Sequence, residues 1–170
     1  MKKTKKYRLR GEKAASIVAK EPKGLGGGLI LVHAYLFGTL WGVMSGLVIH
    51  LTILAVGQWN VLTTPGSESY HPLWAPLILF KIGGNLVGAT LVGYLLHLFF
   101  KKSRRFPRFF IVCMMAKIVF LITGYFVADL IPAAADSDKG LWQISFTIIG
   151  ASVCIPYILR SKRVKNTFVR

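Results

Sequence analysis

The chain has 170 residues, 54% of them hydrophobic, and its 22 Lys and Arg against six Asp and Glu leave a formal net charge of +16. Its apolar stretches exclude an ordinary water-soluble domain, because more than about 18 successive apolar residues with few charges are typical of a membrane span. Nucleic-acid binding does not explain the charge, because the cations alternate with the apolar stretches instead of forming one basic patch.

The alternating pattern predicts an all-α integral membrane protein, a four-helix up-down-up-down bundle. A basic tail with a glycine-rich end, residues 1–28, comes first, and a basic tail, residues 160–170, comes last. The membrane domain covers residues 29–159. Its expected spans are Leu29–Val56, Leu73–Phe100, Phe109–Ile131 and Leu141–Leu159.

The cations predict how the bundle is oriented. Nine Lys or Arg precede the first span, five lie in the turn at 101–108 and five follow Leu159, whereas the other two connections contain Lys139 alone. Lys and Arg are retained on the cytoplasmic side of a membrane. We therefore expect both termini and the turn at 101–108 to be cytoplasmic.

Two glycine stripes predict close helix packing. Gly38, Gly42 and Gly46 recur every four residues in the first span, and Gly84 and Gly88 repeat this spacing in the second. Small residues let helix backbones approach closely in lipid, where no hydrophobic force drives helices together. The seam can join helices of one chain, two copies, or this chain and another membrane protein.

A set of polar residues within the spans is the candidate site. It consists of His50, Lys81, Asn85, Lys117 and Asp129. Each ionisable residue at a helix centre costs about 2.5–3.5 kcal/mol on insertion scales, so each requires a reason. Counting ~1.5 Å per residue from the span ends places His50, Lys81 and Asp129 within reach of one another, with Asn85 one turn deeper and Lys117 near the bilayer centre.

Three explanations of this set remain open. Lys81 can pair with Asp129 and fix the helix register. In that case Lys117 is neutral, reaches the cytoplasmic side, or meets a bound anion. Alternatively the residues form a path for a small anion or a proton, or they contact another membrane protein.

The remaining polar residues favour no enzyme, cofactor or metal. Cys113 and Cys154 lie within spans, where packing is the simplest role, and without clustered histidines they predict neither a disulfide framework nor zinc. No Ser-His-Asp spacing and no cofactor fingerprint is present. The loop residues Glu68, His71, Asp136 and Asp138 are typical of solvated side chains.

The C-terminal tail carries a second candidate site. Arg160, Lys162, Arg163 and Lys165 directly follow the last span, as expected of charges that bind anionic headgroups. The particular order Ser-Lys-Arg-Val-Lys-Asn-Thr-Phe is not explained by charge. This order is compatible with binding of a specific lipid or of a protein partner.

The run Ile155–Val169 resembles the closing signature of a bacterial membrane family known as domain of unknown function 2569. Residues 24–27, Gly-Leu-Gly-Gly, and the Phe-Phe-Lys-Lys turn with Pro107 support the resemblance. Gly28 and Cys154 depart from it, since the family commonly has Trp at these positions. The resemblance implies a four-span inner-membrane protein and carries no activity.

The sequence thus predicts a multi-pass protein of the bacterial inner membrane. The first hypothesis is an accessory or assembly component for other membrane proteins, because almost no domain lies outside the spans. The alternative is a minimal transporter or channel for a small ion that uses Lys81, Asn85, Lys117 and Asp129.

Overall fold

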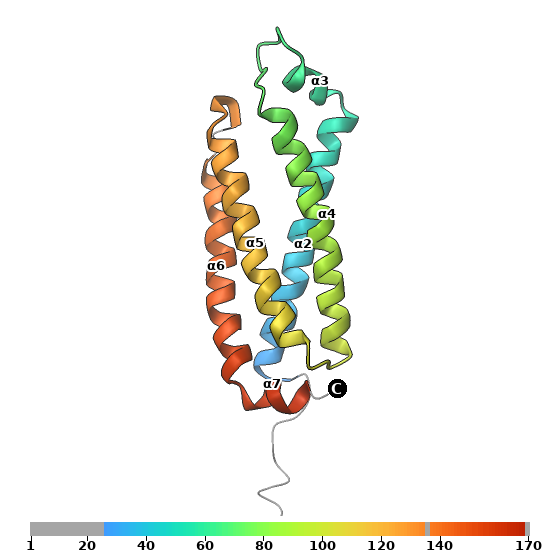
Figure 1. Cartoon of the computed structure of the whole chain (residues 1–170), viewed down its shortest axis with the longest axis vertical. Helices are drawn as coiled ribbons and strands as arrows, with labels where there is room; N and C mark the ends of the chain where they lie inside the picture. The colour runs from blue at the N-terminus through green and yellow to red at the C-terminus, as the bar shows by residue number, and fades with distance from the viewer. Residues whose placement is uncertain (1–25, 135–136, 169–170) are drawn as a thin grey trace, which may run out of the picture.

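Four long helices form the protein, whose computed structural model describes residues 26–134 and 137–168. They are α2 (Gly28–Ala55), α4 (Trp74–Phe100), α5 (Phe106–Asp129) and α6 (Ser137–Arg160), and they run side by side along the long axis (Figure 1). Each is long and apolar enough to cross a membrane, and the described residues contain no strand. The predicted four-span, all-α fold is therefore confirmed.

The helix bounds differ from the predicted spans by at most four residues. The largest differences lie where a helix continues past the apolar stretch into polar sequence. At the start of α5, Pro107 occupies one of the first two helical positions. Proline is favoured there because its missing N–H would have no partner in the helix.

Short elements mark the two ends of the bundle. One end, which we call the loop end, carries α3 (Gln58–Thr63), residues 64–73 and the short 3-10 helix η1 (Pro132–Ala134). The other, the basic end, carries the turn at 101–105 and α7 (Lys162–Thr167). Residues 1–25 of the predicted N-terminal tail, Asp136 and the side chain of Asp138 lie outside the described residues.

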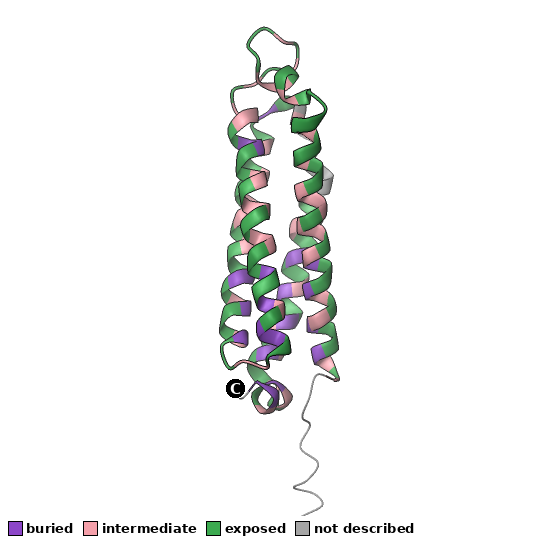
Figure 2. Ribbon diagram, turned by 90° about the vertical axis from the view of Figure 1, so that its right-hand side faces the viewer, coloured by how far each residue is buried: buried purple, intermediate pink, exposed green. Residues whose placement is uncertain are grey.

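The apolar core lies at the basic end (Figure 2). The ring of Phe106 stacks on that of Phe168, with centroids 4.7 Å apart, and meets Phe99 edge-on at 5.3 Å. Leu29, Leu95 and residues from the start of α5 and the end of α6 complete this core. The bundle is therefore closed by packed side chains at its basic end.

Helix α2 separates from α6 toward the loop end. It packs along α4, while α5 packs against both α4 and α6. In Figure 1, α2 lies near α6 at the basic end and on the far side of α4 at the loop end. The helices are consequently packed less closely toward the loop end than around the core of the basic end.

Close packing occurs at some of the predicted glycines. A Cβ added at Gly46 would press on a side chain of α4, and one at Gly84 would overlap the ring of Phe120. At Gly38 and Gly42, an added Cβ would meet nothing within 4 Å. The stripe of the first span therefore contributes to packing within the chain at one end and leaves the rest of its face uncovered.

Candidate functional site

A cavity of about 310 Å³ lies between all four long helices, in the half of the bundle toward the loop end. We call it the loop-end cavity. It brings together four of the five predicted cluster residues, His50, Lys81, Asn85 and Asp129. The other polar side chains that line it are those of Tyr125 and Gln143.

Small residues create this space. Gly46 of α2, Gly124 of α5 and Gly140 of α6 all line the cavity, so three of its four walls have backbone where a side chain would otherwise project. On the fourth wall, Lys81 and Asn85 are four residues apart, which places them ~6 Å apart along one face of α4. The sequence thus places glycines on three walls of the cavity and two polar side chains, one helical turn apart, on the fourth.

Asp129 and His50 lie at different places in the cavity wall. Asp129 is the last residue of α5 and is exposed, so it lies at the mouth of the cavity. The ring of His50 donates through Nδ1 to the carbonyl oxygen of Gly46, one turn earlier in α2. This bond leaves Nε2 as the ring nitrogen available to the cavity.

The two lysines within the spans have no carboxylate partner among the described residues. Lys81 and Asp129 line the same cavity, yet no ion pair within 4.0 Å joins them, and none involves Lys117. The ion pair that would fix the helix register is thus absent from the described structure. A buried ammonium without a counter-charge costs several kcal/mol, unless water or an anion compensates it.

A second cavity, of about 160 Å³, lies deeper in the bundle and is lined by Lys117. We call it the central cavity. The Nζ atom of Lys117 lies 6.0 Å from the centroid of the Tyr35 ring, at the outer limit of a cation–π contact. Tyr35 in turn donates to the carbonyl oxygen of Thr147 at 3.3 Å. The predicted single cluster is therefore divided over two cavities.

The sequence analysis missed polar residues in and beside the central cavity. Thr39 of α2 and Gln143 of α6 line this cavity. Each has a polar neighbour four residues away on its own helix, Tyr35 and Thr147, that does not line it. A search of each span for polar residues at i and i+4 would have found both pairs. Their partners across the bundle were not predictable from spacing alone.

The two cavities adjoin. Asn85, Phe120, Leu121 and Gln143 line both of them. The ring of Phe120 packs against Gly84 and lies 4.8 Å from the ring of Phe80, centroid to centroid. The two cavities therefore share the polar residues Asn85 and Gln143, and the ring of Phe120 lies at their junction.

Helix α7 explains the order of residues in the C-terminal tail. The side chain of Ser161 caps the helix by accepting from the backbone N–H of Val164, at 3.4 Å. Val164 and Phe168 are buried against the core of the basic end. The spacing of apolar residues in this segment is thus accounted for by packing within the chain, without a partner.

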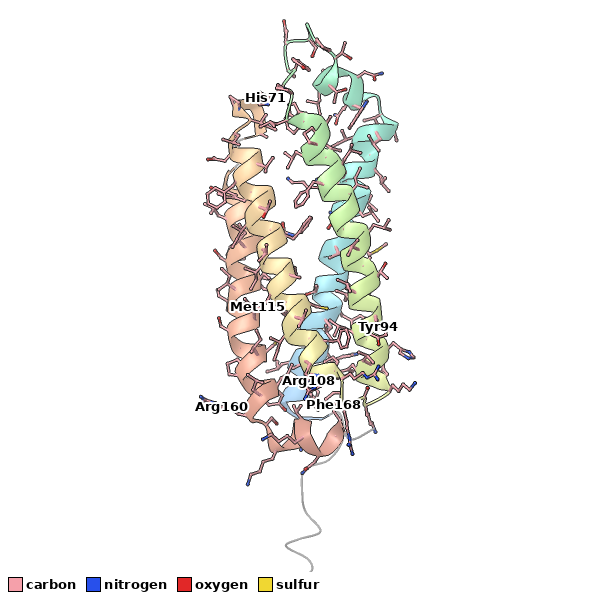
Figure 3. All side chains as sticks on the ribbon, viewed as in Figure 1. His71, Tyr94, Arg108, Met115, Arg160 and Phe168 are labelled. Atoms are coloured by element: carbon pink, nitrogen blue, oxygen red, sulfur yellow. The ribbon has the colours of Figure 1, made fainter. Side chains whose placement is uncertain are left out.

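The predicted headgroup-binding cations lie around this helix. Arg160, Lys162 and Lys165 are exposed, while Arg163 is half-buried and its guanidinium approaches Gly27, at the start of α2. Figure 3 shows Arg108, Arg160 and Phe168 at the basic end, opposite His71 at the loop end. Contact of these cations with anionic lipid stays a prediction.

The cysteines and loop acids are placed as follows. Cys113 and Cys154 are buried free thiols in the core of the basic end. Glu68 is exposed in the connection between α3 and α4. In the part of the chain that the structure describes, no three His, Cys, Asp or Glu side chains come close enough together to hold a metal ion.

Comparison with known proteins agrees with this architecture. Residues 22–169 match the family described as "Protein of unknown function (DUF2569)". The chain is 26% identical over 150 residues to "Inner membrane protein YdgK" of Escherichia coli (strain K12). The aligned residues cover 87% of this chain and 95% of that protein. No solved structure matches the chain. The four apolar helices and this relative confirm the predicted multi-pass, inner-membrane location.

Proposed function

The chain belongs to the DUF2569 family, and from that premise we propose that this membrane protein binds a small anion inside its bundle, as a carrier or channel would. Transport of a small ion is the alternative that the sequence offers beside assembly with other membrane proteins. One observation supports it above the others: Lys81 lines a cavity of about 310 Å³ and has no carboxylate partner among the described residues.

The composition of the cavity linings fits an anion. Lys81 and Lys117 against Asp129 leave an excess of one positive charge over both cavities, with His50 neutral. The amide groups of Asn85 and Gln143 add N–H donors at the junction. In a low-dielectric site such donors and cations interact strongly with an anion, because little water screens them.

Cysteine labelling tests whether water and anions reach the cavity. In a Cys113→Ala, Cys154→Ala background, Asn85→Cys reacts with two methanethiosulfonates of similar size, one carrying a sulfonate and one a trimethylammonium group. We expect the sulfonate reagent to react faster than its counterpart, relative to a free thiol. Adding Lys81→Gln should remove this preference, because the excess positive charge is gone.

Leu86→Cys is the matched control. Leu86 follows Asn85 in α4, is 59% exposed on the outer surface and lines neither cavity. At that depth its surroundings are lipid, so it should label poorly with both reagents. Equal labelling of the two positions, or a preference for the cationic reagent at position 85, would contradict anion binding.

Assembly with another membrane protein is the second candidate. It is favoured by the uncovered face of α2, where Gly38 and Gly42 have nothing within 4 Å of an added Cβ and Trp41 between them is 77% exposed. Gly38→Leu/Gly42→Leu should reduce the amount of other membrane proteins that co-purify with the chain in native nanodiscs. Gly83→Leu, at an equally open glycine of α4, should not. Unchanged association in the double variant would remove this candidate.

The orientation of the bundle is also a proposal, supported by the positive-inside pattern: the basic end faces the cytoplasm. The loop-end cavity would then open toward the periplasm. A C-terminal green fluorescent protein fusion should fluoresce and a C-terminal alkaline phosphatase fusion should be inactive. The opposite result would invert the direction of access to the cavity.

A further inference from the structure

We infer that the bundle holds two anion positions in series, one at Lys81 and one at Lys117, and that the ring of Phe120 is the partition between them. This inference rests on the proposed function and adds the second position and its barrier. The ligand class is a small inorganic or carboxylate anion from the aqueous phase, small enough for a cavity of about 160 Å³.

Phe120 lies where the two cavities meet. It lies on α5 and is one of four residues that line both cavities. Its ring packs against the bare backbone of Gly84 and beside the ring of Phe80. An aromatic ring that contacts the facing helix at the junction of two cavities narrows the connection between them.

Lys117 has surroundings that fit a second anion. Lys117 comes three residues before Phe120 in α5, on the side of the ring away from the loop end. The central cavity there contains no carboxylate among its lining residues, and the Tyr35 ring at 6.0 Å compensates the charge only weakly. The amides of Asn85 and Gln143, which also line this cavity, complete a set of donors for a second anion.

The spacing of Asp129 and Lys117 along α5 gives the depth of the second position. Asp129, at the mouth, and Lys117 are 12 residues apart, which corresponds to ~18 Å of helix. Beyond Lys117, the core of the basic end begins with Cys113 and Met114, which are both buried. An anion would therefore pass the mouth, Lys81 and Phe120 in that order, and stop above the packed core.

Two thiols report the two cavities separately. Cys113 lines the central cavity and becomes the single thiol in a Cys154→Ala variant. Ala128→Cys, in a background without native cysteines, lines the loop-end cavity alone. The protein is reconstituted in phosphatidylcholine vesicles, which contain no anionic headgroups, and the sulfonate reagent is added on the loop-end side.

Phe120→Ala tests the partition. We expect the labelling rate of Cys113 to rise by about tenfold, because a position reached through rare openings becomes continuously accessible. The rate at Ala128→Cys should not change. Phe126→Ala is the control, since Phe126 lies on the same helix, is 62% exposed on the outer surface and lines neither cavity. If Phe120→Ala does not fold, Phe120→Leu keeps most of the apolar volume and should give a smaller increase.

Lys117→Gln tests the second anion position. It should remove the preference for the sulfonate over the trimethylammonium reagent at Cys113, and it should change the ratio of the two rates less at Ala128→Cys, because Lys81 and not Lys117 lines the loop-end cavity. Added chloride or acetate should slow labelling of Cys113 when Lys117 is present. Protection that appears only after an anionic phospholipid is added would assign the position to a headgroup and overturn the aqueous ligand.

The outcomes separate this inference from the proposed function. No sulfonate preference at Asn85→Cys, the position that lines both cavities, would refute anion binding altogether. A preference there, combined with equal labelling of Cys113 in the parent and Phe120→Ala, would leave the proposed function standing and overturn the partition. Cys113 that stays unreactive in a folded Phe120→Ala would overturn it as well.

Discussion

Removing the side chain of Phe168 is predicted to loosen the basic end of the bundle. The residue is 5% exposed, stacks on Phe106 at 4.7 Å and lies 5.8 Å from the ring of Phe99. A buried aromatic side chain removes ~150–250 Å² from water, worth ~4–6 kcal/mol at ~25 cal/mol per Å² as an upper bound. Measured Phe→Ala costs in cores are ~3–5 kcal/mol. We expect a loss of ~3 kcal/mol for Phe168→Ala, because α7 is near the chain end and can shift into part of the space.

Thermal unfolding in a mild detergent measures this loss. For a chain of this length, ~1 kcal/mol corresponds to ~2–4 °C, so Tm should fall by ~6–12 °C. Lys165→Ala is the control, since Lys165 is exposed on the same short helix and should change Tm little. If Phe168→Ala leaves Tm as unchanged as the control does, α7 does not close the bundle. The C-terminal order of residues would then need an external partner.

Three further tests, at Gly150, Tyr35 and Ser161, examine other parts of the packing by the same melting assay. Gly150→Ala should lower Tm strongly, because the added Cβ would overlap the Tyr35 ring. Gly38→Ala should leave Tm nearly unchanged, because its Cβ would meet nothing within 4 Å. Equal changes in Tm would contradict the contact between α2 and α6. Tyr35→Phe removes the bond to the Thr147 carbonyl and should cost ~0.6 kcal/mol, the mean for hydrogen bonds between membrane helices; no measurable change in Tm would leave that bond without a stabilising role. Ser161→Ala removes the cap of α7 and should cost ~0.5–2 kcal/mol, with Ser161→Asp restoring part of it, and a neutral result would argue against the cap.

The cavity and the core lie in opposite halves of the bundle, which is consistent with the proposed anion binding. Packed rings at the basic end hold the helices together. Glycines at the loop end leave room for a ligand. A variant that fills the cavity should therefore affect binding more than stability, and a variant in the core should do the reverse.

Sequence reasoning predicted the candidate site in part. His50, Lys81, Asn85 and Asp129 were expected to lie together, and they line one cavity, because depth in a span follows from counting residues at a constant rise. The separation of Lys117 from them was not predicted. It depends on the ring of Phe120 and on Tyr35 from another helix, and neither the facing of helices nor the rotamer of a ring follows from residue counts.

Sequence reasoning also left α7 unidentified. Four cations in a six-residue stretch are typical of a solvated tail, and the apolar residues Val164 and Phe168 are too few to show a periodic pattern. Their burial requires the pocket formed by Phe99 and Phe106, which come from the opposite ends of a turn far away in the chain.

The amino-acid sequence by itself determined that four helices cross the membrane, because the free energy of placing a residue in lipid depends mainly on its own side chain and on runs of its neighbours. Only the tertiary structure decided which lysine meets which cavity and which glycines are packed. Those relations depend on how α2 leans away from α6, and that angle is the joint result of contacts between side chains distant in the sequence.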